Sequence, residues 1–135
     1  MTALLEIQGI GPAKASKLKA AGIRSVEALL KQGATPKGRK EIVAAGFSKG
    51  EILRWVNHAD LFRVKGVAWQ YAELLEAAGV DTIVELSKRD PENLAETMVK
   101  KNASGPKKLV QLVPSPKSVK AWIAQAKKLP RVVSY

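Results

Sequence analysis

Apolar and polar residues alternate along the chain with the spacing of short amphipathic helices, and strand-like alternation is almost absent. Three Thr-Pro, Asp-Pro or Ser-Pro pairs are typical helix starts, and the sequences beginning at Ser48 and Thr82 fit capping boxes. We therefore predict an all-α fold. The helices expected from this pattern span residues 3–7, 12–21, 25–32, 36–45, 48–63, 69–78, 82–88, 91–101, 106–112 and 116–128.

The hydrophobic pattern repeats along the chain. Residues 4–30 align without a gap on residues 61–87, with eight identities in 27 positions, and a later part of the pattern recurs at an offset of 67. The second copy therefore holds about ten extra residues, which we place around residues 100–106 as a flexible loop. This internal duplication predicts two units of about five short helices each, packed together, at residues 1–59 and 60–135.

The centre of the first copy is a tight turn between two helices. Gly9 and Gly11 flank one apolar residue, so the backbone can take a positive φ at either glycine, and Pro12 suits the first position of a helix. We expect the backbone N–H groups at this helix start to attract an anion. Lys14 and Lys17 should face outward beside them, which predicts a site for a nucleic-acid phosphate.

This stretch resembles the helix-hairpin-helix motif and is similar to the DNA-binding hairpins of family X DNA polymerases. The residues that carry the resemblance are Ile7, Gly9, Ile10, Gly11, Pro12, Ala15, Leu18 and Gly22. It implies that the amides of Gly9, Gly11 and Ala13 bind a phosphate without sequence specificity, and that turn carbonyls hold K⁺ or Na⁺ when nucleic acid is bound. By position, those carbonyls belong to Leu5, Ile7 and Ile10.

The second copy departs from this motif. Ala68, Trp69, Tyr71 and Leu74 replace its second glycine, its proline and its two lysines, and two glutamates are added on the same helix. These changes favour a structural or protein-contact role over phosphate binding. We expect Trp69 and Tyr71 to pack in a core rather than to stack on an unpaired base.

A second resemblance covers nearly the whole chain. On residues 55–67 and 71–82 the sequence resembles an uncharacterised family of bacterial proteins that is described only as a domain of unknown function. The resemblance implies tandem helix-hairpin-helix (SAM-like) units and no settled activity.

The net charge of +11 is concentrated at the two ends of the chain. Residues 1–59 carry a net +6, residues 60–96 a net −4, and residues 97–135 a net +9 without any acidic residue. A polyanionic partner is the expected consequence. Additional nucleic-acid contacts are predicted at Lys100, Lys101, Lys107 and Lys108, in or beside the flexible loop.

Several classes of function lack support in the sequence. Cysteine is absent, and the single histidine, His58, makes a zinc site improbable and suits a surface or capping role. No nucleotide-binding loop or catalytic triad is recognisable, so we expect no enzymatic activity. No segment has the length and apolarity of a membrane span, and no leader is evident; a cytoplasmic, nucleoid-associated location without a membrane partner is expected.

These features together predict a non-enzymatic protein that binds nucleic acid without sequence specificity, with double-stranded DNA as the expected partner. Its affinity would come from the first hairpin and the basic C-terminal region. Two alternatives stay open on the sequence. One is a protein-interaction adaptor that docks a partner through its second unit, and the other is an RNA-binding protein.

Overall fold

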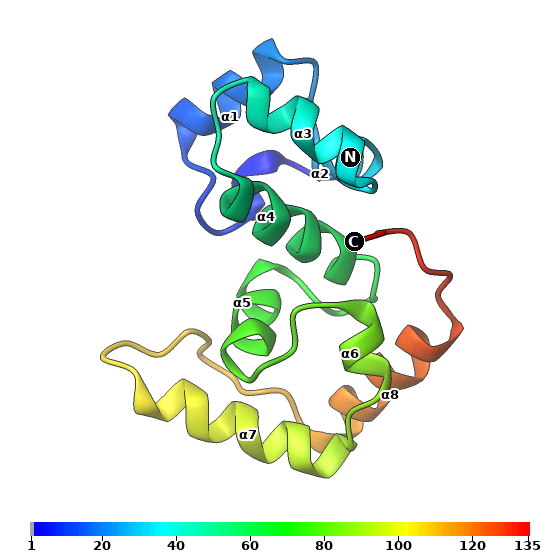
Figure 1. Ribbon diagram of the computed structural model, residues 1–135. Coiled ribbons are helices and arrows are strands. Elements are labelled where there is room, and N and C mark those ends of the chain that lie inside the picture. Colours follow the sequence, from blue (N-terminus) through cyan, green and yellow to red (C-terminus); the bar gives the residue numbers. More distant parts are fainter. Residues whose placement is uncertain (1) are drawn as a thin grey trace. The chain divides into compact units, whose positions relative to one another are not determined.

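The structure is a computed structural model that describes residues 2–135, and these residues form helices and loops without any strand (Figure 1). The all-α prediction is confirmed. The elements are the 3₁₀ turn η1 (Leu4–Glu6) and the helices α1 (Pro12–Ala20), α2 (Val26–Gly33), α3 (Pro36–Ala44), α4 (Lys49–Leu61), α5 (Trp69–Ala77), α6 (Ile83–Ser87), α7 (Pro91–Ser104) and α8 (Pro116–Lys128).

Side chains cap most of these helices where the sequence predicted. The side chains of Thr35, Asp90 and Ser115 each accept the N–H three residues further on, and each precedes a proline at the first helical position. At the start of α4 the Glu51 N–H donates to the Ser48 hydroxyl at 3.1 Å, and the Ser48 N–H donates back to the Glu51 carboxylate at 3.2 Å. The predicted capping box at Ser48 is therefore confirmed.

The chain divides into two compact units. The first consists of the residues up to Asp60 together with Arg131–Tyr135, and the second consists of Leu61–Pro130. The C-terminal segment joins the first unit because the Ser134 N–H donates to the Ala34 carbonyl and the Arg39 guanidinium of α3 donates to the Ser134 carbonyl, each at 2.7 Å. The hydrophobic pattern contains no signal for this return of the chain.

The hairpin turns of the two units have matching geometry. Gly9 has a φ of +96° and Gly66 a φ of +95°. In both turns the N–H of the residue after the glycine donates a hydrogen bond of 3.1 Å to the carbonyl three residues before it. A tryptophan packs under each glycine: an added Cβ would lie 3.2 Å from Trp55 Nε1 in the first unit and 2.9 Å from Trp122 Nε1 in the second. Both tryptophans are buried, at 1% and 5% exposure, as the apolar stripes predicted.

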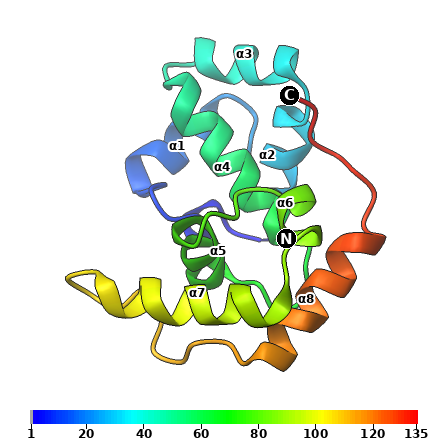
Figure 2. The same ribbon diagram turned by 60° about the horizontal axis from the view of Figure 1, so that its bottom comes forward.

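The segment after α7 differs from its prediction. Helix α7 continues to Ser104, no helix forms over residues 106–112, and the chain doubles back along α7 to reach α8 (Figure 2). The buried Asn102 side chain explains this, because its oxygen accepts the N–H groups of Leu109 and Val110 at 2.8 and 3.1 Å and its NH₂ donates to the Val110 carbonyl at 3.1 Å. These bonds replace helical pairing at residues 109 and 110. Residues 100–104, predicted as part of a flexible loop, instead belong to α7.

Two further expectations about burial are wrong. His58, expected at the surface or in a cap, is 1% exposed in the interior of α4. Trp69, expected in a core, is 38% exposed at the start of α5, whereas Tyr71 is half-buried with its ring centroid 5.4 Å from that of Trp122.

Candidate nucleic-acid interface

The two glycines of the first turn have different roles. Gly9 takes the positive φ that the turn needs, and a side chain there would also press on Arg54 and Trp55, each 3.2 Å from the added Cβ. Gly11 is extended, with φ −85° and ψ 179°, and an added Cβ would meet nothing within 4 Å. The backbone therefore requires glycine at position 9, while glycine at position 11 keeps open the space in front of α1.

The first turn of α1 exposes backbone N–H groups that lack a side-chain cap. In the part of the chain that the structure describes, side chains cap every α-helix except α1 and α5, whose N-cap residues are Gly11 and Ala68. The first N–H groups of a helix have no partner within the helix. The amides of Ala13 and Lys14 therefore lie at an exposed helix start, where the helix dipole favours an anion.

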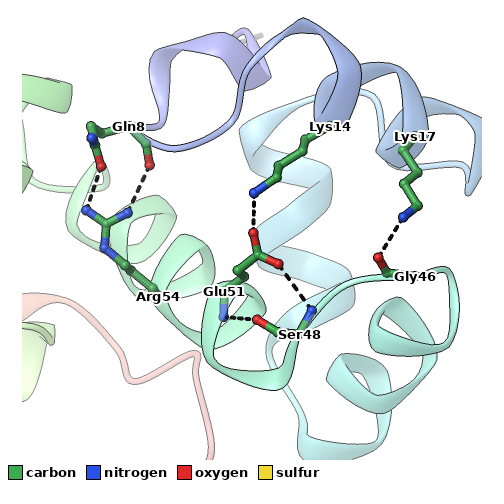
Figure 3. Close-up of polar contacts among 7 residues, drawn as sticks. All are labelled: Gln8, Lys14, Lys17, Gly46, Ser48, Glu51 and Arg54. Carbon is green, nitrogen blue, oxygen red and sulfur yellow. Dashed lines mark hydrogen bonds and ion pairs between the residues drawn. The ribbon is translucent and has the colours of Figure 1, made fainter.

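Both predicted lysines are exposed, and the structure shows that both also make contacts within the first unit (Figure 3). Lys14 forms an ion pair with Glu51 of α4, and its Nζ lies 5.4 Å from the ring centroid of Trp55. Lys17 donates to the Gly46 carbonyl at 2.6 Å, and its Nζ lies 4.8 Å from the ring centroid of Phe47. The lysines thus connect α1 to the start of α4, a role that the sequence did not reveal.

Glu51 is the acidic residue of this cluster. The Lys14 ammonium that donates to it, together with the Ser48 N–H, lowers the pKa of the Glu51 carboxyl below its ordinary value of 4.5. The carboxylate is therefore charged at neutral pH and offsets the charge of Lys14. The sequence indicates Glu51 only as part of a capping box and gives no sign of its contact with the hairpin.

Arg54 is a second residue of the cluster that sequence analysis missed. Its guanidinium donates to the Gln8 carbonyl at 3.1 Å and to the Gln8 side-chain oxygen at 2.7 Å, which fixes the residue before Gly9 (Figure 3). The repeat contained a usable signal, because the equivalent position in the second copy is Ala121. A cation present in one copy only indicates a feature special to that copy.

The four lysines predicted near the C-terminal end fall into two groups. Lys100 and Lys101 lie on the last turns of α7, where Lys100 pairs with Glu96 at 3.2 Å. Lys107 and Lys108 lie on the segment between α7 and α8 and line a pocket in the second unit. The five predicted phosphate-binding residues belong to the first unit, and these four lysines belong to the second.

The fold and the cluster define an all-α protein with an exposed, uncapped helix start beside basic side chains. Residues 8–129 match the model of the family described as Domain of unknown function (DUF4332), and the chain belongs to this family. No curated protein and no solved structure was found to match the chain. Over residues 2–135, no helix is long and apolar enough to cross a membrane, and no group of His, Cys, Asp or Glu is placed to hold a metal ion.

Proposed function

We propose that this chain is a non-enzymatic DNA-binding protein. In this proposal its first hairpin is a helix-hairpin-helix motif that binds a backbone phosphate without sequence specificity. One observation carries the proposal: the amides at the start of α1 have no side-chain cap, and the space beside the Gly11 Cα is open. A phosphate oxygen placed there accepts hydrogen bonds from the amides of Ala13 and Lys14 and gains from the helix dipole. Bases are not read, because the proposed contacts go to phosphate oxygens.

The charged side chains around the turn support the same reading. Lys14 and Lys17 stand on α1 beside the amides, and the first 59 residues carry a net +6. When a phosphate binds, the Lys14 ammonium exchanges its Glu51 partner for the phosphate or shares itself between them. The ion pair with Glu51 therefore weakens the contact between Lys14 and the phosphate, and substitution of Glu51 can measure by how much.

The carbonyls of Leu5, Ile7 and Ile10 are the candidate ligands for a monovalent cation in this proposal. Neutral carbonyl oxygens suit K⁺ or Na⁺, and the Ile7 carbonyl keeps one lone pair while it accepts the Ile10 N–H at 3.1 Å. A bound cation would neutralise part of the phosphate charge at the turn.

The substitution Gly11→Asp tests the phosphate site without unfolding the protein. Asp is a strong N-cap residue, the extended conformation of Gly11 suits it, and its side chain has open space. Its carboxylate would bond the amides of α1 and occupy the proposed phosphate position. Stability should be unchanged or higher by up to about 1 kcal/mol, while duplex affinity should fall at least about tenfold.

The second unit supplies a matched control. Ala68 occupies the equivalent N-cap of α5 with φ −94° and ψ −178°, so Ala68→Asp adds the same charge and the same kind of cap. Fluorescence anisotropy with labelled duplex DNA, single-stranded DNA and duplex RNA across a salt series compares the two variants. Wild type should bind duplex DNA with a log–log salt slope of roughly −3 to −5, or about four phosphates.

Loss of duplex binding in Gly11→Asp with binding kept in Ala68→Asp is the expected result. Equal affinities of the two variants would refute the hairpin as the phosphate site. No binding of any nucleic acid by wild type at low salt would refute the proposed function and direct the search to a protein partner. A preference for duplex RNA over DNA would refute the DNA assignment and leave the phosphate site intact.

A further inference from the structure

The second unit contains a pocket that the proposed phosphate site does not use. It has a volume of about 420 Å³ and lies between the start of α5 and the segment that follows α7. The lining residues are Trp69, Gln70, Tyr71, Lys107, Lys108, Leu109, Val110, Gln111 and Leu112. This set combines aromatic, apolar and cationic side chains with two amides, and it contains no carboxylate.

Trp69 is the notable residue of the pocket. It is 38% exposed, whereas Trp55 and Trp122 are 1% and 5% exposed. A large aromatic ring left partly in water offers a flat apolar face to a ligand. Such a face beside cations is the arrangement by which proteins stack an unpaired base while lysines follow the phosphate backbone.

The wall of the pocket that the segment after α7 forms is hydrogen-bonded to other residues of the second unit. The Asn102 side chain accepts the N–H groups of Leu109 and Val110 and donates to the Val110 carbonyl. The Tyr71 hydroxyl donates to the Leu112 carbonyl at 3.2 Å. Lys107 and Lys108 directly precede these hydrogen-bonded residues. A preorganised wall lowers the entropy that binding must overcome.

We propose that this pocket binds a single-stranded nucleic-acid segment, with one base stacked on Trp69 and with Lys107 and Lys108 on the adjacent phosphates. The inference rests on the proposed nucleic-acid binding of the chain and adds a second site of different specificity. Charge complementarity selects this occupant: the C-terminal part from residue 97 carries a net +9 without an acidic residue. An acidic protein segment is the competing occupant, and the test below distinguishes it.

The test compares a short oligothymidine with an abasic strand of the same length and phosphate number. Wild type should bind the oligothymidine about 5- to 150-fold more tightly, because only this strand can stack a base. Trp69→Ala should remove the preference, and Trp69→Phe should keep part of it. Because the other two tryptophans are buried, quenching of the accessible tryptophan emission on titration should report Trp69.

The lysines are tested by the salt dependence of oligothymidine binding. The double substitution Lys107→Gln/Lys108→Gln should reduce the log–log slope by roughly 1.4, or about 0.7 for each phosphate contact on a single strand. The matched control is Lys127→Gln/Lys128→Gln at the end of α8, which removes the same charge outside the pocket. A smaller change of slope is expected for the control.

Equal affinity of wild type for the two strands would overturn the inference, as would a base preference that survives Trp69→Ala. A pocket that serves an acidic protein segment gives the first of these results. Duplex binding by Gly11→Asp separates this outcome from failure of the proposed function. If Gly11→Asp loses duplex binding while Trp69→Ala leaves oligothymidine binding unchanged, the proposed base pocket is refuted and the proposed phosphate site in the first hairpin is supported.

Discussion

Substitution of Asn102 by alanine should destabilise the second unit strongly. Asn102 is 4% exposed and makes three hydrogen bonds to the backbone of Leu109 and Val110. At roughly 0.5–1.5 kcal/mol for each bond, the loss amounts to about 3 kcal/mol, and the buried backbone groups at Val110 are left without these partners. A change of this size lowers Tm by on the order of 10 °C.

Urea unfolding followed by circular dichroism measures the loss, and amide hydrogen exchange locates it. The N–H groups of Leu109 and Val110 should be protected in wild type and should exchange quickly in Asn102→Ala. The neighbouring exposed Gln111 is the control, because Gln111→Ala should change the free energy of unfolding by no more than about 0.5 kcal/mol. An Asn102→Ala protein as stable as the control, or unprotected amides in wild type, would refute the reasoning.

Three other predictions concern the first unit. Gly38→Ala should lower the free energy of unfolding by more than about 2 kcal/mol, because an added Cβ would lie 1.8 Å from the Gln32 carbonyl oxygen. Gly50→Ala, whose Cβ would meet nothing within 4 Å, should raise the free energy of unfolding by about 0.5–1 kcal/mol. Urea midpoints compare the two variants. Glu51→Gln keeps the acceptor for the Ser48 N–H but removes the ion pair of Lys14, so duplex affinity should rise and the log–log salt slope should steepen by about 0.9. Glu41→Gln on α3 is the control with the same change of charge, and an equal gain of affinity in that variant would contradict the prediction. Because the pKa of Glu51 is lowered from 4.5, its contribution to stability is complete above about pH 4.5 and is lost as the pH falls through the lowered pKa. Glu51→Gln should remove this step from the pH dependence of the free energy of unfolding. A step of the same size in the variant would show that another group causes it.

Most of the helical architecture could be predicted from local chemistry. Ser, Thr and Asp caps followed by proline determine helix starts through short-range hydrogen bonds, so the structure reproduces the starts at Pro36, Pro91 and Pro116. The predicted helix over residues 106–112 failed because the buried amide of Asn102 captures the backbone of that segment. This contact joins positions seven and eight residues apart, beyond the periods that sequence patterns report.

The candidate site was predictable only in part for the same reason. The Gly-Ile-Gly-Pro sequence indicated a turn and an exposed helix start, and the structure assigns the positive φ to Gly9 rather than Gly11. The contacts of Lys14 with Glu51 and of Arg54 with Gln8 span 37 and 46 residues, so they depend on how α4 packs against the hairpin. No local pattern encodes these distances along the chain.

The central claim is that the amides at the start of α1 hold a backbone phosphate. The most direct measurement is a titration of ¹⁵N-labelled protein with a short DNA duplex, followed by amide chemical shifts. We expect the amides of Gly11, Ala13 and Lys14 to shift most, and the equivalent amides of Ala68, Gln70 and Tyr71 to shift little. Unmoved amides at the start of α1 while the duplex binds elsewhere on the chain would contradict it.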